Sequence, residues 1–118
     1  MTDRTYDKGL AGEGRALEYL EQKGMRLVHK RYRAPGGEAD LIMRDGDALV
    51  FVEVKLRNTG ATGDGLIAVT KKKQRRIIKT ALYYLSAHEH DGPVRFDVVE
   101  ETLGGIRHIK DAFQGKEF

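Results

Sequence analysis

The segment at residues 37–55, GEADLIMRDGDALVFVEVK, predicts two antiparallel strands joined by a tight turn. Asp45-Gly46 is among the strongest short-range signals for a β-hairpin, and branched apolar residues are common on both sides of it. We expect the strands at residues 40–43 and 49–55. The second strand also carries charged residues between apolar neighbours, and their position in a sheet requires a physical explanation.

The side chains of residues 49–55 divide between the two faces of the predicted sheet, because neighbours along a strand point in opposite directions. Glu53 and Lys55 share one face with Phe51. The opposite face can join an apolar core, since it carries Val50, Val52 and Val54. One face of this strand is therefore charged.

The turn predicts how the two strands are aligned. If Asp45 and Gly46 are its two central residues, Asp40 pairs with Phe51 across the hairpin. Asp40 then lies on the same face as Glu53 and diagonal to it. The two carboxylates are expected to be neighbours, whereas a slip of one residue would send Asp40 to the opposite face.

Two explanations are open for this charged face. If the hairpin lies at the surface, Asp40, Glu53 and Lys55 form a solvated cluster of ion pairs. If the strand is central and has a helix on either face, the charges are partly buried. Unpaired buried carboxylates are costly, and a metal ion or a cationic partner is the usual compensation.

The remaining elements are expected on both sides of the hairpin. Leu10, Leu17 and Leu20 recur at helical spacing and predict a helix at residues 8–23, which Gly24 ends. Residues 25–33 predict a strand. A second helix is expected from Thr70, a candidate N-cap, to about residue 88, after a polar loop at residues 57–65.

Two further strands are expected near the C-terminus. Val94, Phe96 and Val98 alternate with charged residues, and residues 106–109 predict a short final strand. The order predicts an α/β fold with a mixed central sheet flanked by helices. The connection through the second helix is expected to be right-handed, which makes the strands before and after it parallel.

The first predicted helix carries an acidic residue, Glu13, within its apolar stripe. Its carboxylate is directed towards the sheet. Taken alone, Glu13 is explained as a glutamate at the helix edge that reaches water or pairs with Arg15 or Lys55. Together with Asp40 and Glu53, however, it supplies three oxygen donors, the hard ligands that suit Mg²⁺ or Mn²⁺.

A run of cations, KKKQRR at residues 71–76, begins the second predicted helix. Cations at a helix N-terminus oppose the helix dipole by about 0.3–1 kcal/mol each, so either a phosphate backbone or ample solvation must explain them. Gln74 lies three residues before Ile77 and can reach the charged face of the sheet. The candidate nucleic-acid-binding residues are Arg57, Lys71, Lys72, Gln74, Arg75 and Arg76.

Composition limits the class of protein. The 118 residues fit a single domain spanning residues 1–118, with a net charge of +3. The absence of cysteine excludes disulfides and thiolate zinc sites and suits a reducing compartment. There is neither an apolar run of membrane-spanning length nor the apolar region of a secretory signal. These features predict a soluble cytoplasmic protein.

Several motifs together give the chain a family resemblance. They are Gly12-Glu13, GEADLI at 37–42, FVEVK at 51–55, Lys72, RFDVV at 95–99 and Ala112-Phe113. This ordered set, which covers about residues 9–113, resembles the bacterial UPF0102 (YraN-like) family. That family is similar to the PD-(D/E)XK nuclease superfamily and particularly to archaeal Holliday-junction resolvases. The resemblance implies a restriction-endonuclease-like αβββαβ core.

The resemblance also implies roles for individual residues. Asp40 matches the motif aspartate, Glu53 and Lys55 match the (D/E)XK element, and Glu13 matches the acidic position of the first helix. Asp40 and Glu53 would bind the divalent metal with the backbone carbonyl of Val54, while Glu13 would hold a metal-bound water or a second ion. Lys55 would orient the attacking water. The implied chemistry is hydrolysis of a phosphodiester bond.

Three functions remain open from the sequence. The first is a Mg²⁺-dependent endonuclease that acts on branched or damaged DNA, as a homodimer by analogy with the resolvases. The second is a nucleic-acid-binding module that has the same fold and no catalytic activity. The third is an interaction protein with charges on its surface, which predicts that Glu13, Asp40 and Glu53 point apart.

Overall fold

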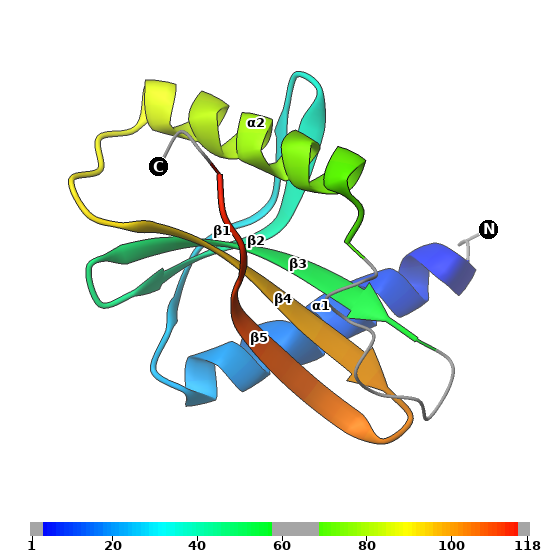
Figure 1. Ribbon diagram of the computed structural model, residues 1–118. Coiled ribbons are helices and arrows are strands. Elements are labelled where there is room, and N and C mark those ends of the chain that lie inside the picture. The colour runs from blue at the N-terminus through cyan, green and yellow to red at the C-terminus, as the bar shows by residue number, and fades with distance from the viewer. Residues whose placement is uncertain (1–3, 58–68, 116–118) are drawn as a thin grey trace.

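Five strands form one sheet in their sequence order, with helix α1 on one face and helix α2 on the other (Figure 1). The structure is a computed structural model and describes residues 4–57 and 69–115. The elements are α1 (Arg4–Gln22), β1 (Arg26–Ala34), β2 (Gly37–Asp45), β3 (Ala48–Leu56), α2 (Lys71–Ala87), β4 (Val94–Thr102) and β5 (Gly105–Phe113). The predicted αβββαβ core is confirmed, and β5 is added at one edge.

Helix α1 starts earlier than predicted and ends where the glycine signal places its end. Gly24 adopts a φ of 93°, a left-handed conformation in which glycine has no steric penalty. Its N–H donates to the carbonyl of Glu21 at 3.0 Å, and the N–H of Met25 donates to the carbonyl of Leu20 at 3.2 Å. These two bonds satisfy the last carbonyls of the helix and turn the chain into β1.

Each helix covers a separate hydrophobic core on its own face of the sheet. The α1 core contains Ala16, Leu20, Met25, Leu41, Met43, Val50, Val52 and Val99. The α2 core contains Ala39, Ile42, Leu49, Phe51, Val69, Ile77, Ala81, Tyr84, Phe96 and Val98. Successive residues of β3 alternate between the cores, as predicted. Neither helix of the described ranges combines the length and apolar character needed to cross a membrane.

The hairpin of β2 and β3 forms as predicted, but its register differs by two residues. Asp45 pairs with Ala48, so Gly46 and Asp47 are the central residues of the turn. Gly46 takes a φ of 61° at the first central position, where a hairpin turn favours glycine. The predicted pairing of Asp40 with Phe51 is therefore wrong. A shift of two residues leaves the faces of β3 unchanged, and Asp40 and Glu53 still line one cavity.

The strand after the crossover is parallel to β3, as predicted. β3 pairs with β4 from Leu49 opposite Val94 to Leu56 opposite Glu101, so β3 lies at the centre of the sheet. The hydroxyl of Thr70 accepts a hydrogen bond from the backbone N–H of Lys73 at 3.2 Å, which confirms the predicted N-cap of α2. The predicted loop at 57–65 lies, from residue 58 onwards, outside the described residues.

Strand β5 extends four residues beyond its predicted end, because a buried carboxylate supports an irregular segment. The register between β4 and β5 shifts between Phe96 and Val98. There the carboxylate of Asp97 accepts the backbone N–H of Asp111 at 3.0 Å, and Asp111 has a φ of 52°. A side chain thus replaces a missing backbone partner, and the strand continues past the bulge.

Asp97 is the centre of a buried ionic network. Its side chain is fully buried and accepts two hydrogen bonds from Arg95, each 2.9 Å, and one from Nε2 of His108 at 2.7 Å. Arg95 also pairs with Asp45 at 2.9 Å. Although burial favours the neutral acid, the bonds from His108 and Arg95 lower the pKa of Asp97. The network joins β4, β5 and the hairpin.

Replacement of Asp97 by Ala is expected to destabilise the protein by about 3–5 kcal/mol, because the largely buried Arg95 and His108 would both lose a partner. Denaturant unfolding followed by circular dichroism measures this change in the free energy of unfolding. Asp91→Ala, at an exposed position, is the control and should change stability by less than about 0.5 kcal/mol. Equal effects of the two substitutions would contradict a structural role for the network.

Candidate active site

The two strands of the hairpin separate at one end and leave a fork in the sheet. The pairing of β2 with β3 ends at Leu41 and Val52, although both strands continue. From Gly37 to Ala39, β2 pairs with β1 and no longer with β3. At the fork, the backbone N–H of Val54 donates to Oδ2 of Asp40 at 2.8 Å. A side-chain carboxylate therefore takes the place of a ladder acceptor.

Asp40 and Glu53 are brought together at this fork. Asp40 directly precedes Leu41 and Glu53 directly follows Val52, so both lie one residue beyond the last pair of the hairpin. Burial, followed by the repulsion of Glu53, raises the pKa of Asp40 to about 7. The bond from Val54 opposes this rise without cancelling it. The fork therefore holds more negative charge than its surroundings stabilise.

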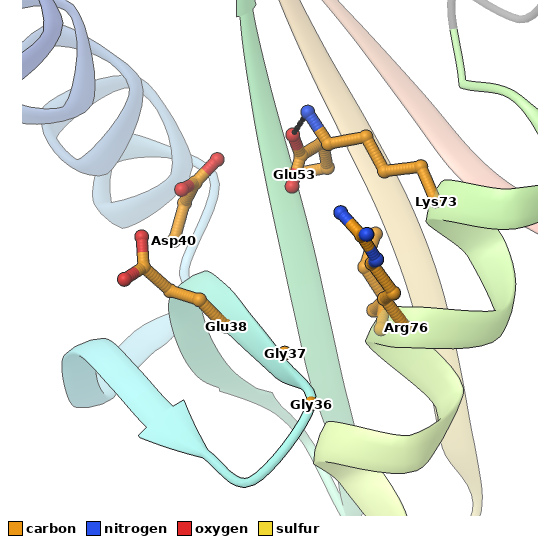
Figure 2. A pocket seen from close by; sticks show the side chains of 8 residues that line it. Gly36, Gly37, Glu38, Asp40, Glu53, Lys73 and Arg76 are labelled. Carbon is orange, nitrogen blue, oxygen red and sulfur yellow. Dashed lines mark ion pairs between the residues drawn. The ribbon is translucent and has the colours of Figure 1, made fainter.

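Two lysines face the carboxylate of Glu53, whose side chain is only 6% exposed. Nζ of Lys73, from the first turn of α2, lies 2.5 Å from Oε1 of Glu53 (Figure 2). Nζ of Lys55 lies 3.9 Å from the same oxygen. Burial and the adjacent Lys73 lower the pKa of Lys55. Although burial opposes its charge, the hydrogen bond to Glu53 raises the pKa of Lys73.

A cavity of about 440 Å³ opens beside these groups. Figure 2 shows the acidic side chains on the strands and the basic side chains on α2 across this cavity. It is lined by Gly36, Gly37, Glu38, Asp40, Glu53, Lys73, Arg76 and Ile77. A Cβ on Gly37 would lie 2.6 Å from the carbonyl oxygen of Arg76, so glycine permits the close approach of β2 to α2.

Glu13 lies on the other side of Asp40. Its carboxylate accepts a hydrogen bond from Nε of Arg31 at 2.8 Å rather than pairing with Arg15 or Lys55. Arg31 has a φ of 49°, unusual for a residue with a side chain. Burial raises the pKa of Glu13, against the bond from Arg31. A smaller cavity of about 100 Å³ includes Glu13, Arg31 and Asp40 in its lining.

The donor set fits a divalent cation bound by the carboxylate pair of Asp40 and Glu53. Two adjacent carboxylates at least half-buried, one of them with a pKa raised to about 7, are an environment that a hard dication would stabilise. Within the described ranges no group of three acidic or histidine side chains is placed to hold a single ion. Glu13, held by Arg31, is separate from the pair in this arrangement.

The predicted nucleic-acid-binding residues divide into two groups. Lys71, Lys72, Arg75 and Arg76 are exposed on the first turns of α2. The amide of Gln74 instead donates to the carbonyl of Val69 at 2.9 Å, within its own helix cap. Nε of Arg57 lies 3.5 Å from the buried carboxylate of Glu100. The exposed group provides a basic surface beside the cavity, which we call the basic end of α2.

Lys73 lines the cavity and is a candidate functional residue that was not predicted from the sequence. It lies four residues before Ile77 and therefore on the buried face of α2, which continues through Thr80, Ala81 and Tyr84. This spacing distinguishes Lys73 from the exposed cations of the same run. Helical periodicity applied to the basic residues, and not only to the apolar ones, would have identified it.

A comparison with known protein families identifies the group to which the chain is related. A model of the uncharacterised protein family UPF0102 matches residues 12–100. The chain belongs to the UPF0102 family. This confirms the membership predicted from the motifs at 37–42 and 51–55.

Relatives in the UPF0102 family are similar over most of their length. The UPF0102 protein of Cupriavidus pinatubonensis is 43% identical over 110 residues, which cover 92% of this chain and 87% of the relative. That of Shewanella amazonensis is 43% identical over 105 residues, covering 89% of this chain and 97% of the relative. That of a Janthinobacterium species is 45% identical over 106 residues, covering 90% and 86%.

Asp40→Asn is expected to stabilise the metal-free protein at pH 8 and not at pH 4. The folded pKa of Asp40 is raised, so wild-type stability falls as pH rises from its usual value of 3.8 to about 7 and Asp40 ionises. Asparagine does not ionise, and its amide oxygen can still accept from Val54. The measurement is the melting temperature in EDTA, with an expected gain of about 4–8 °C per kcal/mol.

The control for this experiment is Asp47→Asn at the exposed hairpin turn, which removes the same charge away from the fork. Its melting temperature should follow that of the wild type at both pH values. A difference between Asp40→Asn and wild type that does not change with pH would contradict the close pairing of Asp40 with Glu53.

Proposed function

We propose that this UPF0102 protein is a metal-dependent endonuclease that hydrolyses phosphodiester bonds in DNA, preferentially in branched or damaged structures. The observation that supports the proposal is the adjacent pair of Asp40 and Glu53 at the fork, with Lys55 on the same strand. This arrangement agrees with the roles that the resemblance to PD-(D/E)XK nucleases implies. The preference for branched DNA, and a homodimer as the active form, rest on the likeness to resolvases.

In the proposed reaction, Asp40 and Glu53 hold Mg²⁺ or Mn²⁺. The ion held there would supply a bound water of lowered pKa and would neutralise charge on the phosphoryl oxygens. Val54 contributes by donating its N–H to Asp40, which fixes the direction of that carboxylate. Lys55 is partly buried, with a side chain 23% exposed, and its ammonium can donate to both the attacking water and a phosphate oxygen.

The basic end of α2 is proposed to hold the DNA backbone next to the fork. Its cations continue from Arg76 at the edge of the cavity to the solvent, and the first turn of α2 contains no acidic residue. Phosphate contacts of this kind position a nucleic acid without reading its sequence. The surface therefore suits an enzyme that recognises DNA structure.

A nucleic-acid-binding module without catalytic activity is the second candidate. One observation favours it: Lys73 pairs with Glu53 at 2.5 Å, so part of the charge at the fork is compensated by the protein itself. A binding module would keep this pair when it holds DNA. The two candidates therefore differ in whether the protein cleaves DNA in the presence of a divalent metal. For the endonuclease alone, this cleavage depends on Asp40.

Asp40→Asn is expected to abolish cleavage and to leave DNA binding largely intact, because the substitution removes a metal ligand while the basic end of α2 is unchanged. The assay incubates labelled linear duplex, single strand, flap and four-way junction with Mg²⁺ or Mn²⁺ and follows the products on a gel. Lys55→Ala should lower the rate by about 10²–10³-fold, as expected for loss of one charge-stabilising donor.

Binding is measured in parallel for the same variants by fluorescence anisotropy. Binding without cleavage by the wild type in either metal would favour the binding module. Cleavage that is unchanged in Asp40→Asn would remove Asp40 from the active site and contradict the proposed mechanism.

Charge reversal at Lys72 and Arg76 is expected to weaken DNA binding and to flatten its salt dependence. Fewer counterions would be released, so the slope of log K against log salt should fall by about 2 for two lost phosphate contacts. Arg26 and Lys79, also exposed, provide the matched double reversal. Identical slopes for the Lys72/Arg76 variant and wild type would show that DNA does not use the basic end of α2.

A further inference from the structure

Lys73 occupies the position in which Glu53 would accept a cation. Its ammonium lies 2.5 Å from Oε1 of Glu53, whereas Lys55, the lysine of the sequence motif, is 3.9 Å from the same oxygen. The carboxylate of Glu53 is 6% exposed, and Lys73 reaches it from the first turn of α2 across the cavity (Figure 2). The pair therefore joins the helix directly to the fork.

A carboxylate that is bonded to an ammonium is a poorer ligand for a metal ion. Lys73, Glu53 and Asp40 line the same cavity, so a dication bound between the two carboxylates would compete with the lysine for Glu53. Competition between two cations for one buried carboxylate weakens the binding of each of them. Lys73 must therefore move, or share its bond, when the ion binds.

A phosphate group in the cavity would be a second partner for Lys73 when its ammonium leaves Glu53. The Lys73 side chain is 41% exposed, and Arg76 lines the same cavity one helical turn further on. Both cations would then face a phosphate group bound in the cavity next to the carboxylates. A small rotation of a lysine side chain is enough to move the ammonium from a carboxylate to such a phosphate, because lysine has a flexible four-carbon stem.

We propose that Lys73 is a substrate-binding residue that Glu53 holds in the free protein and releases when a divalent cation binds. This inference rests on the proposed function, since it takes the pair of Asp40 and Glu53 as the metal site. Lys73 then donates to a non-bridging oxygen of the DNA phosphate. Metal binding and phosphate binding are thereby coupled, and each favours the other.

The coupling predicts that loss of Lys73 changes the affinity for the metal ion in the opposite direction to loss of a residue that supports the metal site. Loss of a residue that supports a metal site weakens metal binding. Loss of Lys73 removes a competitor and should tighten it. Lys73→Met keeps a long unbranched side chain and the backbone N–H that Thr70 caps, so the helix start is retained.

The test measures Mn²⁺ binding to the DNA-free protein by isothermal titration calorimetry. Lys73→Met is expected to bind Mn²⁺ about tenfold more tightly than wild type, within the 5–150-fold range typical of coupled sites. Lys73→Arg keeps the cation and should stay close to the wild-type affinity. Arg76→Met is the matched control, because it removes a positive charge from the same cavity and leaves the pair of Lys73 with Glu53 intact.

The Mn²⁺ affinities of these variants decide whether Lys73 competes with the metal. An affinity of Lys73→Met equal to or weaker than that of wild type would overturn the inference and leave the proposed function standing. Equal tightening in Lys73→Met and Arg76→Met would also overturn it, since the effect would then be one of general charge. Asp40→Asn is measured alongside: if this variant binds Mn²⁺ as well as wild type, the proposed metal site itself fails, and the inference fails with it.

Discussion

The separation of β2 from β3 is the constraint on which the candidate site depends. Where the pairing of β2 with β3 ends, the N–H of Val54 has no partner in the ladder, and the carboxylate of Asp40 replaces it at 2.8 Å. This bond fixes Asp40 beside Glu53 and leaves space next to both. The cavity, the repulsion between the two acids and the approach of Lys73 all follow from the same divergence of two strands.

A comparison of two aspartates of the sheet separates structural from functional charge. Asp97 accepts four hydrogen bonds, from Arg95, His108 and a backbone N–H, and its pKa is lowered. Asp40 accepts one bond from Val54 and its pKa is raised to about 7. The environment of Asp97 is complete without a ligand. That of Asp40 is incomplete, and perturbed acids in a cavity are candidates for function.

Most of the fold could be predicted from local sequence signals. The end of α1 at Gly24, the cap at Thr70 and the alternation along β3 depend on neighbouring residues. The hairpin register could not be predicted, because both Asp45-Gly46 and Gly46-Asp47 are acceptable turns and only tertiary packing selects one. The bulge that extends β5 depends on the side chain of Asp97, a long-range contact that leaves no local pattern.

One cation of the KKKQRR run, Lys73, could have been predicted from local helical spacing, although its acidic partner could not. Charge runs are usually solvated, and four of these residues, Lys71, Lys72, Arg75 and Arg76, have no acidic partner among the described residues. Lys73 differs because helical spacing turns it inward, and a carboxylate from another element meets it there. The partner of Lys73 thus accounts for one charge that opposes the helix dipole. Either solvation or an anionic partner must compensate the other four, and the DNA of the proposed function would supply a row of phosphates along a single helix face.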